Sequence, residues 1–71
     1  MALLAVNVRN QLRGVVKNIL WGDVVSEVEV ETSSGVVTSV ITTRSIKELS
    51  IDIGTEVLAL VKATDVAIAR V

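Results

Sequence analysis

The chain has 71 residues with no Cys and no His, which excludes disulfides, zinc sites and catalytic centres built on a His base or a thiolate. Hydrophobic residues make up 51% of the sequence, more than a chain this short can bury alone, so we expect copies of it to associate. The formal net charge of −1 argues against nucleic acid and acidic membranes as partners.

Residues 1–6 are apolar, but this segment is too short to span a membrane and lacks the basic residues that begin a signal peptide. We therefore expect a cytoplasmic protein. No Pro, repeat or low-complexity stretch interrupts the sequence, and residues 1–71 are predicted to form a single domain.

The first predicted strand covers residues 10–20, in a sequence with fifteen Val residues, a β-branched type that favours strands. Gly14 lies inside this run and predicts a bulge or a sharp bend. The pair Gly22-Asp23 that follows is typical of a turn. Trp21, the only aromatic residue, stands beside this turn and is interpreted as a hydrophobic plug at a subunit contact.

The next two predicted strands, residues 24–32 and 36–43, form a hairpin around the polar loop 32–35. In the first of them Glu residues alternate with Val28 and Val30, which is the period of a strand with one buried face. The hairpin is therefore the clearest local structure in the sequence.

Residues 44–50 follow this hairpin, and one short helix is predicted within this segment. Ile46 and Leu49 are three residues apart and would share one helix face. Ser45 and Glu48 have the spacing of a capping box, which predicts that the helix starts at Ser45.

Two further β-like runs, residues 56–63 and 65–71, bring the number of predicted strands to five. Five short strands with one helix after the third is the order of an all-β, OB-like barrel, in which closure removes the sheet edges. An SH3-like barrel and an open β-sandwich remain as alternatives.

The acidic residues are the remaining candidates for catalysis, but they fall in turns and on the alternating face of a strand, as on a solvated surface. No Gly-rich phosphate loop is present. We therefore predict no catalytic residue and no enzyme. An OB-like barrel also suggests single-stranded nucleic-acid binding, but seven basic residues against eight acidic ones and one aromatic provide neither a positive groove nor stacking platforms.

Three short segments are rich in hydrogen-bond donors within an otherwise aliphatic chain. They are residues 7–11, 41–45 and 60–63. A tetrahedral dianion requires hydroxyl and N–H donors on several sides, together with one or two cations. Thr42 and Ser45 would supply hydroxyls beside the N–H groups of a helix start, and Arg9 and Lys62 would supply positive charge. Each also has an ordinary role, since Ser45 is a good N-cap and Lys62 can protect a strand edge.

The same segments resemble the Mop family, the molbindins, whose fold also serves as the molybdate-binding TOBE-type domain of regulators and transporters. The resemblance rests on residues 9–14, on Thr42 and Ser45 within an Ile-Thr-x-x-Ser-Ile pattern, and on residues 59–66. The spacing matches from about residue 7 to residue 68, which covers nearly the whole chain.

The resemblance implies an OB-like barrel that assembles as a homohexamer, a trimer of dimers, with molybdate or tungstate at subunit interfaces. It implies that protein donors hold the intact oxyanion by hydrogen bonds, without direct metal coordination and without an organic cofactor. The residues implied as ligands are Asn7, Arg9, Asn10, Thr42, Ser45 and Lys62. Asn7 stands where the family has Ser, so its contact with the anion would come from a longer side chain.

These inferences together predict a cytoplasmic protein that stores or buffers molybdate or tungstate. Two alternatives stay open. One is a structural or interaction β oligomer with a degenerate anion site, which Asn7 favours. The other is a single-stranded nucleic-acid-binding module, whose affinity for an oligonucleotide would fall steeply with salt.

Overall fold

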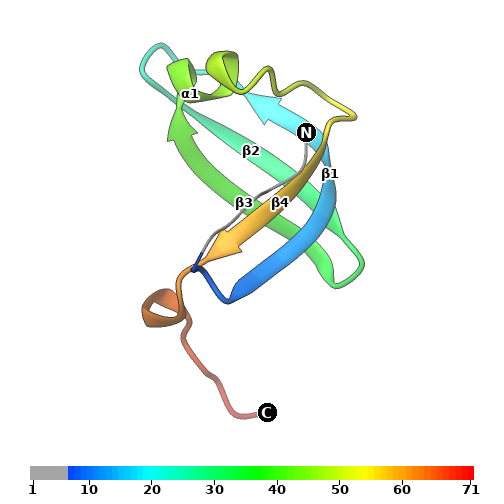
Figure 1. Cartoon of the computed structure of the whole chain (residues 1–71), viewed down its shortest axis with the longest axis vertical. Helices are drawn as coiled ribbons and strands as arrows, with labels where there is room; N and C mark the ends of the chain where they lie inside the picture. The colour runs from blue at the N-terminus through cyan, green and yellow to red at the C-terminus, as the bar shows by residue number, and fades with distance from the viewer. Residues whose placement is uncertain (1–6) are drawn as a thin grey trace.

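The computed structural model describes residues 7–71, and the apolar segment 1–6, expected to be neither a signal peptide nor a membrane span, lies outside them. Elements follow in the order β1 (Asn10–Leu20), β2 (Val25–Thr32), β3 (Gly35–Thr42), α1 (Thr43–Glu48), β4 (Glu56–Val61) and the 3-10 turn η1 (Ala63–Asp65). The four strands make one antiparallel sheet in the order β3-β2-β1-β4. The sheet curls strongly, and α1 lies at one end of it (Figure 1).

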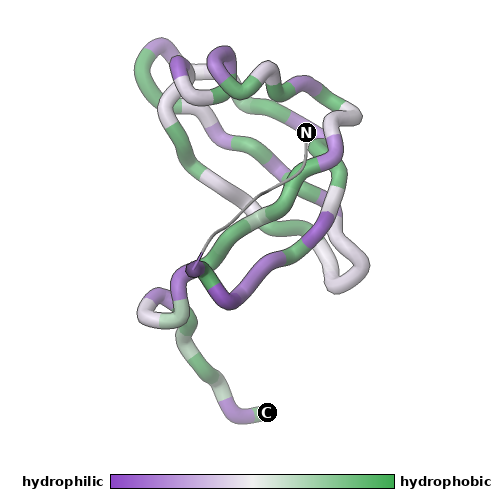
Figure 2. Tube along the Cα trace, viewed as in Figure 1, coloured by the Kyte–Doolittle hydropathy of each residue, from purple (hydrophilic) through white to green (hydrophobic). Residues whose placement is uncertain are grey.

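One face of the sheet is buried because its strands alternate apolar and polar residues, as Figure 2 shows along the chain. On β2, Val28 and Val30 are buried while the Glu residues that alternate with them stay accessible to solvent. The core consists of five buried aliphatic residues from β1, β2 and α1. They are Val16, Ile19, Val28, Val30 and Ile46. The predicted all-β class and the strand period of β2 are confirmed.

The hairpin between β2 and β3 closes where the sequence predicts it. Thr32 pairs with Gly35 across the two-residue turn 33–34. The Thr32 hydroxyl accepts a hydrogen bond from the Ser34 N–H at 3.1 Å and donates one to the Gly35 carbonyl at 2.7 Å. This turn sets a continuous register that ends with Val25 opposite Thr42.

The irregularity predicted at Gly14 lies further along β1. The bulge falls between Val16 and Asn18, whose partners on β2 are consecutive residues. Gly14 instead permits a close backbone approach, because a Cβ at this position would lie 2.5 Å from the Glu31 carbonyl oxygen.

Helix α1 begins two residues earlier than predicted, so the expected start at Ser45 and its capping box with Glu48 are wrong. Thr42 is the N-cap, and its hydroxyl accepts a hydrogen bond from the Ser45 N–H. The Thr43 N–H donates to the Val24 carbonyl at 2.9 Å, which ends β3 and turns the chain into the helix. Within residues 7–71, no helix is long and apolar enough to cross a membrane.

The predicted fifth strand, residues 65–71, is not formed, so the sheet has four strands and is not closed by strand pairing within the described chain. Residues 63–65 form η1 instead, and residues 66–71 run away from the sheet (Figure 1). Ile68 in this segment is 90% exposed. The segment has the alternation of a strand, but none of the four strands that the structure describes pairs with it.

Candidate functional site

The donor-rich segments fall into two groups at opposite ends of the sheet (Figure 1). Thr42 and Ser45 lie where β3 runs into α1, and the register places Thr42 opposite Val25, beyond the last paired residue of β1. Asn10 starts β1 and pairs with Val61, so Lys62 follows at that same end. The structure therefore brings the predicted site residues together only within each group.

At the α1 end, the hydroxyls of Thr42 and Ser45 form a hydrogen-bonded pair with 2.7 Å between Oγ1 and Oγ. Thr42 Oγ1 also accepts a hydrogen bond from the Ser45 N–H at 3.1 Å. Each hydroxyl has one proton, and one of the two protons lies between the oxygens. The pair thus has one remaining O–H proton to donate to a ligand.

The backbone N–H groups of the helix start contribute less than the sequence suggested. Thr43 N donates to the Val24 carbonyl and Ser45 N to the Thr42 hydroxyl, so both are already used. The helix has six residues. The hydroxyl pair is therefore a candidate ligand donor at this end.

Next to the hydroxyl pair in the chain, Thr43 belongs to a hydrogen-bond ring with two buried side chains, which sequence reasoning missed. We call the Gly22 backbone and the side chains of Ser26 and Thr43 the hydroxyl ring. The Gly22 N–H donates to Ser26 Oγ at 3.1 Å, Ser26 Oγ lies 2.7 Å from Thr43 Oγ1, and the Thr43 hydroxyl donates to the Gly22 carbonyl at 2.7 Å. One sequence signal could have indicated it, since Ser26 is a polar residue on the strand face that carries Val28 and Val30.

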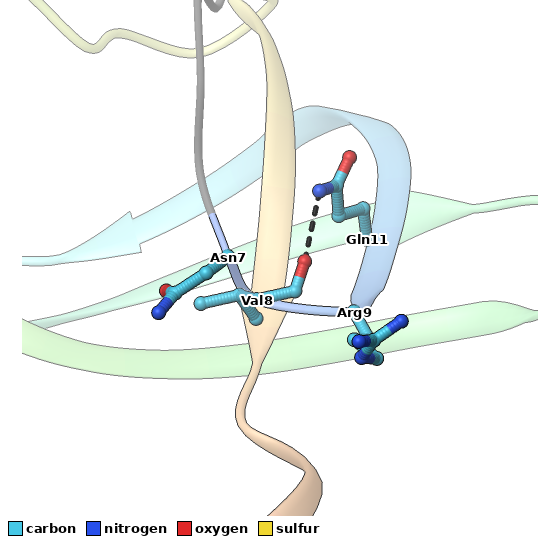
Figure 3. A pocket seen from close by; sticks show the side chains of 4 residues that line it. All are labelled: Asn7, Val8, Arg9 and Gln11. Atoms are coloured by element: carbon cyan, nitrogen blue, oxygen red, sulfur yellow. Dashed lines mark hydrogen bonds between the residues drawn. The ribbon is translucent and has the colours of Figure 1, made fainter.

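At the other end of the sheet, the start of β1 is a hydrophilic stretch with an open depression of about 650 Å³ (Figures 2 and 3). Its lining residues are Asn7, Val8, Arg9 and Gln11. Figure 3 shows the side chains of Asn7 and Arg9 pointing in different directions, while Gln11 Nε2 donates to the Val8 carbonyl at 2.9 Å. Gln11 was not among the predicted ligands, and its amide shapes this depression.

Among the described residues, neither Arg9 nor Lys62 at this end has an acidic partner. Among residues 7–71 the one ion pair joins Arg13 and Glu56, at 2.8 Å. Arg9 and Lys62 are both exposed and take no part in it. Asn10 is partly engaged, because its Nδ2 donates one hydrogen bond to the Val61 carbonyl at 3.0 Å and keeps a second N–H.

The candidate site residues provide positive charge and hydrogen-bond donors, and they provide few groups suited to metal coordination. In the part of the chain that the structure describes, no three Asp or Glu residues are grouped so that they could hold a metal ion. One hydroxyl pair at one end and two exposed cations at the other can bind an anion with several oxygen acceptors.

Comparisons with known proteins extend this picture. The family model of the TOBE domain matches residues 7–68. Molybdenum-pterin-binding protein 3 of Clostridium pasteurianum is 42% identical over 66 residues, which cover 92% of this chain and 97% of that protein. The structure of a molybdate-binding protein from Sporomusa ovata is similar with a TM-score of 0.89, at 30% identity over 94% of this chain and 100% of the other.

A third similarity is to the cytoplasmic molybdate-binding protein ModG in a form with molybdate bound. The TM-score is 0.79 and the identity 34%, over 84% of this chain but 43% of the ModG chain. All three of these similar proteins are named as binding proteins.

Proposed function

Because this chain belongs to the TOBE-domain family, whose model covers residues 7–68, we propose that it binds molybdate as an intact oxyanion. The observation that carries the proposal is the match in fold to the molybdate-binding protein of Sporomusa ovata, which extends over 94% of this chain at 30% sequence identity. The absence of His and Cys agrees with this, because the available donors suit an anion better than a bare metal ion.

The ligands that we propose are Asn7, Arg9, Asn10, Thr42, Ser45 and Lys62. Molybdate is a tetrahedral dianion, and every oxygen accepts hydrogen bonds. Arg9 can bind two oxygens with its planar guanidinium group, while Lys62 supplies a compact charge with three N–H donors. The Thr42–Ser45 pair adds one O–H donor, and such charge-assisted hydrogen bonds are stronger than neutral ones.

The complete site requires two copies of the chain, because the two donor groups lie at opposite ends of one sheet. One subunit would contribute Thr42 and Ser45, and its neighbour would contribute Arg9 and Lys62. A cluster of exposed apolar residues beside the hydroxyl pair supports association at that end. It comprises Leu20, Trp21, Val24, Val25 and Val40. We propose a homohexamer arranged as a trimer of dimers, with Trp21 in a subunit contact.

The proposed role is storage or buffering of molybdate or tungstate in the cytoplasm, by a single-domain protein without catalysis and without an organic cofactor. The relative from Clostridium pasteurianum carries molybdenum-pterin in its name. We favour the inorganic anion because the proposed donors are polar and charged, and because we assign the apolar surface around Trp21, on which a pterin ring could stack, to a subunit contact. Trp21 is the one aromatic residue in the sequence.

Titration calorimetry combined with native mass spectrometry tests this function. Molybdate and tungstate should bind to a multimer at least about tenfold more tightly than sulfate or phosphate, a difference of about 1.4 kcal/mol. Equal weak binding of all four anions would leave a generic basic patch. Binding of a molybdenum-pterin compound without binding of molybdate would show that the ligand class is wrong.

A second candidate function is a structural β oligomer with a degenerate anion site. The observation that favours it is Asn7, which stands where the Mop pattern has Ser. The same titration separates the two candidates, because the degenerate site predicts a stable multimer that takes up no molybdate.

A further inference from the structure

The hydroxyl ring is a closed circuit in which the direction of every hydrogen bond is determined. The Thr43 proton goes to the Gly22 carbonyl, so the proton between Thr43 and Ser26 must come from the Ser26 hydroxyl. The Ser26 oxygen in turn accepts from the Gly22 N–H. Ser26 and Thr43 are 3% and 8% exposed, which protects the ring from competition by water.

The ring joins three places that are distant in sequence. Gly22 lies in the corner between β1 and β2, Ser26 lies on β2, and Thr43 is the first residue of α1. A side chain at position 22 could not be accommodated, because its Cβ would collide with the Val25 carbonyl oxygen. A fourth hydrogen bond, from Thr43 N to the Val24 carbonyl, fixes the same corner to the helix start.

The residue next to the ring is Thr42, one half of the hydroxyl pair. Its backbone is held on one side by pairing with Val25 on β2 and on the other by the buried Thr43. Ser45 follows within the first turn of the same helix and is bonded to Thr42. The position of the pair in space is therefore set by the ring together with the β2–β3 register.

We propose that Ser26 and Thr43 are positioning residues for anion binding, which hold the Thr42–Ser45 pair where its O–H meets one oxygen of the anion. This inference rests on the proposed function. A donor that is already fixed loses little conformational freedom when the ligand binds, so its placement raises affinity and favours one anion size over another. A ring that only satisfies buried polar groups would stabilise the fold without influencing either property.

Four variants test the proposal. Thr43→Val keeps the shape of the side chain and removes the hydroxyl, Ser26→Ala opens the ring from the other side, and Thr43→Ser retains the hydroxyl. Thr55→Val is the matched control, because Thr55 Oγ1 also accepts a backbone N–H, from Asp52 at 2.9 Å, in a loop away from the hydroxyl pair.

Molybdate and sulfate affinities are measured by calorimetry well below the melting temperature of each variant, and native mass spectrometry checks the assembly. Thr43→Val and Ser26→Ala should weaken molybdate binding about tenfold or more. They should also lower the ratio of the affinity for molybdate to the affinity for sulfate. Thr43→Ser and Thr55→Val should retain the wild-type affinity and ratio. If Thr43→Val fails to fold, Ser26→Ala and Thr43→Ser decide the question.

Two outcomes would overturn the inference separately from each other. If both ring-opening variants melt earlier but bind molybdate with wild-type affinity and selectivity, the ring has a structural role alone and the proposed function stands. If the wild-type protein binds no molybdate, the proposed function fails, and the role of the ring in it fails as well.

Discussion

Lys62 and Arg9 are residues that could destabilise the ligand-free oligomer and yet increase its affinity for an anion. Both carry positive charge without an acidic partner in the described chain. If a subunit contact brings two such cations close together, they repel each other in the empty site and are partly removed from water. A bound dianion reverses the sign of this interaction.

The variant Lys62→Met should separate these two contributions, because it keeps much of the length of the side chain and removes the charge. Without ligand it should melt at or above the wild-type temperature. The free energy of unfolding of the wild type should rise by about 2.7 kcal/mol at a molybdate concentration a hundredfold above the dissociation constant, whereas that of the variant should rise little.

Thermal melts at fixed subunit concentration, with and without molybdate, measure both effects. Lys17→Met on β1 is the control, since Lys17 is another exposed lysine and lies at the bulge. A full molybdate increment in Lys62→Met would exclude Lys62 as a ligand.

At the scale of an element, helix α1 depends on contacts with the rest of the protein. Six residues are too few for a stable helix in isolation, so tertiary contacts must hold it. Ile46 is 0% exposed and inserts into the core, whereas Leu49, three residues on, is 66% exposed. The sequence suggested one shared apolar face, and the structure divides it between the core and the surface.

Ile46→Ala should lower the free energy of unfolding by about 2–5 kcal/mol, because it leaves a cavity among Val16, Ile19 and Val28. Leu49→Ala is the matched control and should cost well under about 1 kcal/mol within the subunit. Urea unfolding followed by the fluorescence of Trp21 measures both. Equal losses for the two variants would contradict this account of the core.

Local patterns were enough to predict the strand period of β2, its hairpin to β3 and the position of the helix in chain order, because each depends on neighbouring residues. The exact helix start was not predictable in this way. Thr42 and Ser45 are both good N-caps, and the choice between them depends on Thr43, whose hydroxyl bonds to Gly22 in another part of the chain. The alternation in residues 65–71 likewise could not reveal whether a neighbouring strand exists.

The donor residues of the candidate site could be predicted from the sequence, but their arrangement in space could not. Thr42 and Ser45 were expected near each other, and the structure joins them by a 2.7 Å hydrogen bond. Their separation from Arg9 and Lys62 follows from the strand order β3-β2-β1-β4, which donor spacing in the sequence does not contain. The role of the predicted ligands stays a prediction until binding is measured.

At the scale of the whole molecule, many large hydrophobic side chains are exposed on the described surface of one chain, and clusters of such residues often mark interaction sites. Trp21 and Val24 at the corner between β1 and β2 are 56% and 74% exposed. The edges of the sheet at β3 and β4 also lack partners within the described chain. Association of subunits would cover both kinds of surface.

Sedimentation at micromolar concentration should therefore show a multimer, with the hexamer as the expected species. Val24→Lys should shift the distribution to smaller species, because it places a charge in the apolar cluster. Ser33→Lys, in the exposed turn between β2 and β3, is the control and should sediment like wild type. A folded wild-type monomer under these conditions would contradict both the assembly and the shared site.

The separation of the two donor groups has a consequence for symmetry and stoichiometry. If each copy carries one half of a site at each end of its sheet, as we propose, every site is complete only in a closed arrangement. Two copies related by a twofold axis complete two sites, and a head-to-tail ring completes one for every contact. In either case we expect one shared anion for each subunit, and the amount of anion taken up reports how many subunits have found a neighbour.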